Sequence, residues 1–463
     1  MKNSNKKVLL LEPNYSNKYP PIGLMKISTY HKMLGYDVVF YKGDLKKFVI
    51  ERIADKCITD LQEIDDSRNW FLSRDIIIEY IAKRKKDTYF QLNLESSKLF
   101  PLLDARVNRA KDYYWNGLWK QNPEWDRVFV TTLFTFYWDI TVETIEFAKL
   151  LVKPDGLLMV GGVLASIQPK ELYQATGIKP YVGVLNIPGQ LDEGDTNIID
   201  NLPLDYSILD EIEYKYPMNN AYYGYTTRGC IRKCPFCAVP TLEPEYNAYI
   251  PLKDRIDLVR DIYGEQKDLL LMDNNVLRSP QFDQIIDEIK ALGFAKGATY
   301  SSPKTGKPIH RYVDFNQGLD AFLLTPHKAE RLGELAIRPA RIAFDHIEDK
   351  DAYVKAIKLC AKNGITHMSN YLLYNGEEFK GKGHSYKADS PEDLYERMRI
   401  SLDLCDEILE EYNTKITIFS FPMRYIPLSD LKRGFVGTHW CMKYLRALQR
   451  MLIPTQGKGV SSR

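Results

Sequence analysis

Three cysteines lie close together near the middle of this chain of 463 residues, at a spacing that suits iron–sulfur chemistry. Cys230, Cys234 and Cys237 form the pattern C-x3-C-x2-C. A short loop of this kind can wrap one corner of a cubane cluster, because each thiolate can reach a different iron. Thiolates also bind zinc, but structural zinc needs a fourth ligand, and no histidine lies between His31 and His310. The pattern therefore favours a [4Fe–4S] cluster with one open iron, with zinc or plain buried thiols as the alternatives.

The surroundings of these cysteines are basic. Arg228, Arg232 and Lys233 would offset the negative charge of a thiolate cluster. The other four cysteines are scattered, which argues against an auxiliary iron–sulfur cluster. One of them, Cys441, is expected to pack in the interior.

The cysteine segment follows the first of six predicted strands. These short apolar runs alternate with amphipathic helical stretches. The runs are Tyr222–Thr227, Asp268–Asp273, His310–Asn316, Arg341–Asp345, His367–Asn375 and Lys415–Phe421. Repeated strand–helix units indicate a parallel barrel or partial barrel, in which chemistry gathers at the carboxyl ends of the strands.

Polar residues stand on or just after several of these strands and are candidates for contacts with a cofactor or substrate. They are Asp273, Asn274, Asn316, Gln317, Asp345, Ser369 and Asn375. The alternative is that such residues only cap strand ends and turns.

An earlier α/β pattern precedes the barrel. Strands are predicted at 8–13, 36–42, 127–134 and 156–162, with helices at 22–34 and 142–152, which implies a doubly wound parallel sheet. The residues of about 44–126 do not follow this alternation of strands and helices, and their pattern predicts a helical insertion. The predicted domains are therefore a Rossmann-like sheet domain (1–188), a linker (189–220), a barrel (221–425) and a C-terminal extension (426–463).

Composition is that of an ordinary globular protein, with 44% apolar and 27% charged residues. The 63 Lys+Arg and 61 Asp+Glu give a formal net charge of +2, so no global charge drives binding to nucleic acid or anionic membrane. No stretch approaches the roughly 20 apolar residues of a membrane span, and the N-terminal apolar run is too short for a signal peptide. Few, clustered cysteines favour a reducing compartment, and we expect a cytoplasmic protein.

The cysteine pattern, with Phe236 directly before the last cysteine, resembles the signature of radical S-adenosylmethionine (radical SAM) enzymes. That resemblance implies a partial (β/α)6 barrel, a [4Fe–4S] cluster on the three cysteines, and S-adenosylmethionine on the open iron. It also implies cofactor contacts from Phe236 and from the strand ends, with Asp273 and Asn274 near the methionine amino group. The Gly-Gly-Glu form common in the family at that strand end is absent here.

The first domain resembles the cobalamin-binding domain that precedes many radical SAM barrels, chiefly through its opening strand and helix and the segment around Gly161 and Gly162. Small glycines at a strand end let a flat ligand approach the backbone. The loop after the first strand lacks the cobalt-ligating histidine of that domain, so cobalamin stays an open second cofactor. The alternative is a structural domain in which Gly161 and Gly162 only form a tight turn.

The leading hypothesis is an enzyme that reductively cleaves S-adenosylmethionine to a 5′-deoxyadenosyl radical and modifies an unidentified substrate, by methyl transfer if cobalamin binds. Its electron donor would be of the flavodoxin or ferredoxin type, and no catalytic residue is singled out. A second hypothesis is RNA modification of the methylthiotransferase kind, using the basic, aromatic run Arg106–Lys120. A third is a noncatalytic iron–sulfur or zinc scaffold.

Overall fold

A computed structural model describes residues 6–381 and 384–452. Its compact parts are two units, which we call the sheet unit and the barrel unit. The sheet unit comprises Met1–Ala165, Pro169–Val182 and Asp205–Pro217, and the barrel unit comprises Ser166–Gln168, Gly183–Leu204 and Met218–Arg463.

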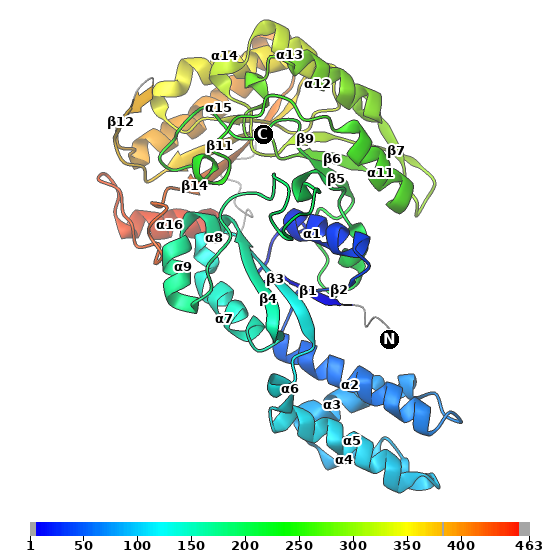
Figure 1. The fold of residues 1–463 in the computed structure, drawn as a ribbon. Coiled ribbons are helices and arrows are strands. Elements are labelled where there is room, and N and C mark those ends of the chain that lie inside the picture. Colours follow the sequence, from blue (N-terminus) through cyan, green and yellow to red (C-terminus); the bar gives the residue numbers. More distant parts are fainter. Residues whose placement is uncertain (1–5, 382–383, 453–463) are drawn as a thin grey trace. The chain divides into compact units, whose positions relative to one another are not determined.

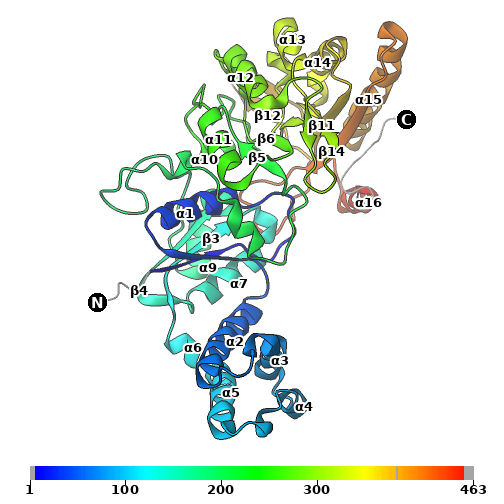
Figure 2. The same cartoon turned by 90° about the vertical axis from the view of Figure 1, so that its right-hand side faces the viewer.

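The sheet unit contains four parallel strands in the order β2-β1-β3-β4. They are β1 (Lys7–Leu11), β2 (Asp37–Tyr41), β3 (Trp125–Thr132) and β4 (Val152–Gly162). Helix α1 (Ile22–Met33) lies on one face, and α7 (Trp138–Ala148) and α9 (Pro169–Thr176) lie on the other (Figure 2). Because β1 is central and covered on both faces, Val8–Leu11 are fully buried, as a continuous apolar run predicts. The doubly wound sheet is confirmed.

Between β2 and β3 the chain forms the predicted helical insertion, which projects from one end of the sheet (Figure 1). Its helices are α2 (Leu45–Ile64), α3 (Arg74–Lys83), α4 (Lys86–Phe90), α5 (Phe100–Trp115) and α6 (Leu118–Gln121). Asp44 caps α2 by accepting a hydrogen bond from the Lys46 N–H at 2.8 Å. The insertion has its own apolar core around the fully buried Trp70, separate from the core of the sheet.

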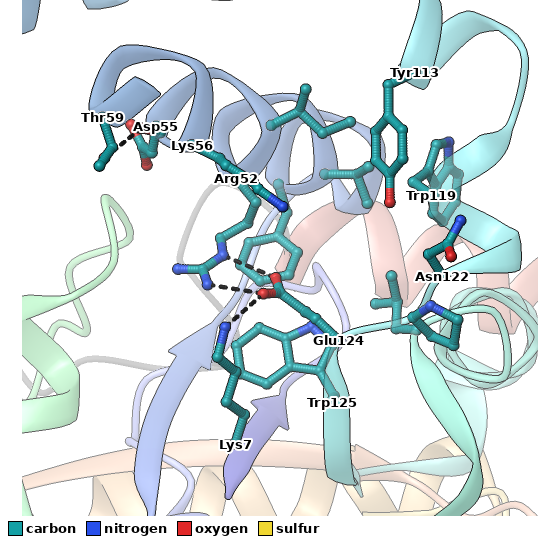
Figure 3. Close-up of a pocket in the computed structure, with 15 residues that line it drawn as sticks. Lys7, Arg52, Asp55, Lys56, Thr59, Tyr113, Trp119, Asn122, Glu124 and Trp125 are labelled. Carbon is teal, nitrogen blue, oxygen red and sulfur yellow. Dashed lines mark hydrogen bonds and ion pairs between the residues drawn. The ribbon is translucent and has the colours of Figure 1, made fainter. Parts of the chain in front are cut away.

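The insertion meets the amino ends of β1 and β3 at a partly buried carboxylate (Figure 3). Glu124 accepts hydrogen bonds from Arg52 at 3.1 and 3.2 Å and from the Lys7 ammonium at 2.9 Å. Burial favours the protonated acid, but these cations hold the pKa of Glu124 below its ordinary value. A cavity of about 420 Å³ lies beside this group, walled by aromatic side chains that include Tyr113 and Trp119.

The barrel unit contains six parallel strands that follow one another in chain order. They are β5 (Ala221–Gly224), β6 (Asp268–Leu271), β9 (Val313–Phe315), β10 (Ala340–Ala343), β11 (His367–Tyr374) and β14 (Thr417–Arg424). They pair as β5-β6-β9 and β10-β11-β14, and parallel bridges such as Leu319–Ile342 link the two halves.

Five helices form an arc outside these strands (Figure 1). They are α11 (Lys253–Tyr263), α12 (Phe282–Ile289), α13 (Pro326–Gly333), α14 (Lys350–Lys362) and α15 (Pro391–Tyr412). The predicted strand–helix rhythm of the second half is therefore confirmed.

Three features were not predicted. Two hairpins, β7–β8 (Thr299–Ser301 and Pro308–His310) and β12–β13 (Phe379–Gly381 and His384–Tyr386), leave the barrel, and α16 (Met442–Leu452) follows it. The predicted strand starting at His310 was wrong at its start, because His310 pairs with Thr299 in the hairpin and the barrel strand begins at Val313.

Part of the stretch predicted as a linker, Asp205–Pro217, packs within the sheet unit. The Tyr216 hydroxyl donates to Glu12, and the Glu211 carboxylate accepts from the Phe40 N–H at 2.7 Å. Glu12 also accepts from the buried Lys42 ammonium at 3.0 Å. This polar network covers the carboxyl ends of β1 and β2. No helix among the described residues is long and apolar enough to cross a membrane.

The separate core of the insertion makes a prediction about local stability. Trp70→Ala should lower the free energy of unfolding of the insertion by about 3–5 kcal/mol, because it removes a fully buried indole. Hydrogen exchange read by mass spectrometry should show faster exchange in α2, α3 and α5 and unchanged exchange in β1 and β3. The neighbouring Phe71→Ala is the control, because Phe71 is 62% exposed. Equal effects of the two substitutions would contradict a core centred on Trp70.

Candidate metal centre

The cysteine loop leaves the carboxyl end of β5, the first barrel strand. Cys230, Cys234 and Cys237 are all free and partly buried. The Cys237 N–H donates to the Cys234 carbonyl at 3.1 Å, so a tight turn carries the last two cysteines. The structure thus places the three sulfurs on one loop at the barrel end where chemistry gathers.

Gly229, directly before the first cysteine, is required by close backbone packing. Its φ is +72°, and a Cβ there would lie 2.1 Å from the carbonyl oxygen of Glu245. The next strand-like segment crosses at this point, because Arg228 and Asn247 form an antiparallel bridge. Only glycine combines this dihedral with this contact.

Glu243 fastens the amino side of the loop. Its carboxylate accepts from the Gly229 N–H and from Asn274 Nδ2, each at 2.7 Å, and it pairs with Arg228. Arg228 Nη2 also donates to both carboxylate oxygens of Asp200, at 2.6 and 2.7 Å. Since two carboxylates already neutralise Arg228, it does not offset thiolate charge, contrary to the sequence-based expectation.

Asp273 holds the start of the loop in place through hydrogen bonds. Its buried carboxylate accepts from the backbone N–H groups of Thr226 and Thr227, the closest at 2.5 Å, and from both hydroxyls at 2.7 and 2.8 Å. Burial raises the pKa of Asp273, and these donors oppose that shift. The network directs the chain from β5 into the cysteine loop, so we assign Asp273 a positioning role in place of the predicted cofactor contact.

Arg232 and Asn275 hold the middle of the loop. Arg232 forms a bidentate pair with Asp320 at 2.7 and 2.9 Å, and its charge acts to lower the pKa of Cys234, as the sequence-based expectation held. Asn275 Nδ2 lies 3.3 Å from the same carboxylate and 3.8 Å from the Cys230 sulfur. Sequence reasoning chose Asn274 and missed Asn275, although both follow β6, because only the backbone path shows which side chain faces the cysteines.

The predicted Phe236 lies in an aromatic group beside the loop. Its ring centroid is 6.2 Å from that of His346, which stacks on Tyr386 with centroids 3.5 Å apart. Asp345, at the carboxyl end of β10, is brought to the same place, and burial raises its pKa to about 7 against the opposing charge of Arg397. The structure therefore gathers Phe236 and Asp345 around the cysteines and adds His346 and Tyr386.

The remaining predicted barrel residues differ in their surroundings. The side-chain amides of Asn316 and Gln317 both point to the Met272 sulfur, at 3.7 and 3.8 Å. Ser369 is buried on β11, and its hydroxyl has no hydrogen-bond partner among the described residues. The neighbouring Asn370 bonds outward to Tyr353 and Ser401, so alternation turns Ser369 toward the barrel interior.

Asn375 has a structural role. Its φ is +70°, its Oδ1 accepts from the Gly437 N–H at 2.8 Å, and its Nδ2 donates to the Tyr425 and Phe435 carbonyls at 3.0 and 3.4 Å. Both side-chain polar atoms therefore anchor the segment after β14, and the predicted cofactor contact is replaced by this tether. Cys441, expected to be buried, is exposed, so that expectation was wrong.

In the sheet unit, Gly161 and Gly162 end β4 beside β3. Gly162 has a φ of +106°, and a Cβ would lie 2.3 Å from the Thr132 carbonyl oxygen, so strand packing explains this glycine without a ligand. A Cβ added at Gly161 would lie 3.9 Å from the Tyr181 side chain, which is an ordinary contact. His31 is fully buried, with Nδ1 2.7 Å from the Ile27 carbonyl and Nε2 3.1 Å from Arg127. It is a core residue and does not replace the missing cobalt ligand.

The thiols favour protonation until a metal binds. Burial and the neighbouring Cys237, Asp345 and Cys230 raise the pKa of Cys234 to about 12, and burial also raises that of Cys237. Iron bound by these sulfurs would displace their protons. No three His, Cys, Asp or Glu side chains in the described ranges are gathered tightly enough to hold one ion. Cysteines of a cubane bind different irons, so they need not converge on one point.

Comparison with known proteins gives only distant structural likeness. No protein-family model and no curated protein matches the sequence. The radical S-adenosylmethionine methyltransferase TsrM from Kitasatospora setae, with cobalamin and a [4Fe–4S] cluster bound, is 14% identical, with 92% of this chain and 77% of that chain covered and a TM-score of 0.48. The structure of the same enzyme with tryptophan and a SAM analogue bound is also 14% identical, with 86% of this chain and 71% of that chain covered and a TM-score of 0.49.

Streptococcus suis SuiB bound to the precursor peptide SuiA is 13% identical, with 52% of this chain and 47% of that chain covered and a TM-score of 0.32. Likeness at this level assigns neither a cofactor nor a substrate. The chemistry of the site has to be inferred from its own residues.

The packing at Gly229 predicts a selective loss of metal binding. Gly229→Ala should remove most of the iron bound after anaerobic reconstitution with iron and sulfide, because the new Cβ forces the loop away from Glu245. Gly264→Ala is the matched control, because Gly264 has a similar φ of +81° with no atom within 4 Å of a Cβ. It should cost about 1–3 kcal/mol of stability, because its backbone (φ +81°, ψ 174°) lies in a region that only glycine adopts readily, and it should leave iron content unchanged. Equal iron in the two variants would refute the requirement.

Proposed function

We propose that the protein is a radical SAM enzyme whose Cys230, Cys234 and Cys237 hold a [4Fe–4S] cluster. One observation carries the proposal: a C-x3-C-x2-C loop leaves the carboxyl end of the first of six parallel strands. Three carboxylates, Glu243, Asp273 and Asp320, position that loop through hydrogen bonds. So much support for one loop suits a site that must present three sulfurs in a fixed arrangement.

Two buried polar atoms, one beside the loop and one inside the barrel on β11, fit a polar cofactor on the open iron. Asn275 Oδ1 and Ser369 Oγ are buried and have no hydrogen-bond partner among the described residues. An unpaired buried polar atom costs about 1–3 kcal/mol, which a ligand's polar groups would recover. When bound, the cluster supplies the electron that cleaves S-adenosylmethionine to methionine and a 5′-deoxyadenosyl radical.

The chain's own residues bind and shield that cofactor. We assign Asn275 and Ser369 to its polar groups, with Asp345 as a further contact. Phe236 and its neighbours His346 and Tyr386 form an apolar wall that limits access of water to the loop. The external electron donor would be of the flavodoxin or ferredoxin type, and a cytoplasmic setting would keep the cysteine ligands reduced.

The sheet unit is relevant to a second cofactor, and so to the reaction that would follow formation of the radical. An open parallel sheet offers a ligand crevice at the carboxyl ends of its strands. Gly161 is compatible with a flat ligand there, whereas Gly162 is already explained by Thr132. We propose methyl transfer as the reaction of this enzyme in a cobalamin-loaded state, with no histidine from the loop after β1 on the cobalt.

The central test uses Cys234→Ala. The variant should lose the cluster's visible absorbance after anaerobic reconstitution and should form no 5′-deoxyadenosine with dithionite and S-adenosylmethionine, because one of three iron ligands is gone. Cys441→Ala is the control, since Cys441 is exposed and outside the loop. Wild-type protein that carries an intact cluster yet makes no 5′-deoxyadenosine would overturn the proposed function.

Two serines on adjacent strands test the cofactor contact. Ser369→Ala should weaken binding of S-adenosylmethionine to the reconstituted protein by about three- to tenfold, as expected for one lost hydrogen bond. Isothermal titration measures this directly. Ser420→Ala is the matched control: its buried hydroxyl also lacks a partner among the described residues, but it pairs in register with Asn370, which faces α14 and α15. An unchanged affinity in Ser369→Ala would exclude the contact.

A further inference from the structure

A second pocket lies at the opposite end of the barrel unit from the cysteine loop. It sits where the chain enters β9, β10 and β11, and it has a volume of about 270 Å³. Five of its lining side chains are cationic or titratable bases: Lys296, His310, Arg311, Arg338 and His367. Of these, Arg311 is paired with Glu265. We call this the basal pocket.

The basal pocket has no carboxylate in its lining. Three stretches of chain that meet there, 289–313, 335–344 and 352–376, contain no Asp or Glu at all. Within the part of the chain that the structure describes, Lys296 and Arg338 form no ion pair. The charges of Lys296 and Arg338 are therefore not neutralised by an ion pair, and the neighbouring Glu334 is bound by Lys290 and Arg331.

The polar contacts hold two of these cations in place without cancelling their charge. The Arg338 guanidinium donates to the Tyr312 hydroxyl at 2.9 Å and lies 5.0 Å from the centre of that ring. The Lys296 ammonium lies against Gly364, where a Cβ would come within 2.7 Å of Nζ. Gly364 thus leaves room for the ammonium at the pocket wall.

The positive charge of the pocket also affects His367, which lines it. Burial and then the charge of Arg338 lower the pKa of His367 below its ordinary value. Its Nδ1 lies 3.1 Å from the Thr366 hydroxyl. His310, in the β7–β8 hairpin, completes the group from the other side.

A purely structural role does not account for this arrangement. The amino end of a barrel usually serves stability, and nearby cations do so in pairs: Arg311 binds Glu265 at 2.6 Å, and Lys290 binds Glu334 at 2.5 Å. Like charges left together without acids oppose folding. The unpaired cations of the basal pocket are therefore better explained by an anionic ligand.

We propose that the basal pocket binds the phosphoryl group of a small phosphorylated molecule. Arginine supplies a planar fork and lysine a point charge, the two usual partners of a phosphate dianion. The volume lies just below the roughly 300–1,000 Å³ of pockets for drug-sized ligands, so a phosphate with a short carbon chain fits. This site is independent of the cysteine loop and of the proposed radical chemistry.

The test compares thermal unfolding of the full chain in sodium phosphate and in sodium chloride of equal ionic strength. Phosphate at about ten times its Kd should raise Tm by about 2–4 °C. The shift should be largely lost in Arg338→Ala and in Lys296→Ala. The control is Lys304→Ala, which should keep the shift, because Lys304 lies on the exposed turn of the β7–β8 hairpin and outside the pocket. If Arg338→Ala does not fold, Lys296→Ala decides, because its side chain is exposed.

Isothermal titration with inorganic phosphate and with glycerol 3-phosphate separates the two sources of the phosphoryl group. Tighter binding of the ester assigns a phosphorylated metabolite, and equal binding assigns free phosphate. The proposal is overturned if phosphate gives no shift beyond chloride, or if both pocket variants, Arg338→Ala and Lys296→Ala, keep the full shift. It is also overturned if only the polyanion heparin binds, since that reports a diffuse basic surface and no pocket.

Discussion

The barrel unit depends on one constraint: a buried carboxylate must be surrounded by donors. Asp273 meets it with the backbone and hydroxyl groups of Thr226 and Thr227. Those two residues are the last before the arginine and glycine that lead to Cys230. Satisfying the Asp273 carboxylate therefore fixes the direction in which the chain leaves β5, and with it the position of all three sulfurs. Glu243 is a second carboxylate that fixes the loop, because it accepts a hydrogen bond from the Gly229 N–H directly before Cys230.

The same carboxylates change how charge is balanced near the cysteines. Arg228 and Arg232 were expected to offset thiolate charge. Arg228 is taken up by Asp200 and Glu243, whereas Arg232, although paired with Asp320, still acts to lower the pKa of Cys234 as expected. The group that reaches the Cys230 sulfur from the described side chains is the neutral amide of Asn275. Neutral donors near a cluster stabilise its charge less than a cation would, so the loop is built for geometry first and for charge compensation second.

Sequence reasoning succeeded where the signal is local. Apolar runs of four to eight residues gave every barrel strand within a few positions, because a buried parallel strand needs a continuous run. It failed where the partner is distant in the chain. Asn375 lies after a strand like a ligand contact, but its amide is used by Gly437 and by two carbonyls beyond β14. Gly162 lies at a strand end like a ligand-binding glycine, but Thr132 on β3 explains it. Neither partner can be read from the residues adjacent in sequence.

The near-neutral total charge conceals a division between the two ends of the barrel unit. At the carboxyl end, Glu243, Asp273 and Asp320 are interleaved with the cysteine loop, and the arginines there are paired. At the amino end, Arg311 and Lys290 are paired with Glu265 and Glu334, but Lys296 and Arg338 form no ion pair among the described residues. A barrel whose charges served only stability would pair them at both ends, because each pair of opposite charges lowers the energy and each pair of like charges raises it. The unpaired Lys296 and Arg338 therefore distinguish the amino end, which we propose binds an anion, from the carboxyl end, which is arranged around the three cysteines.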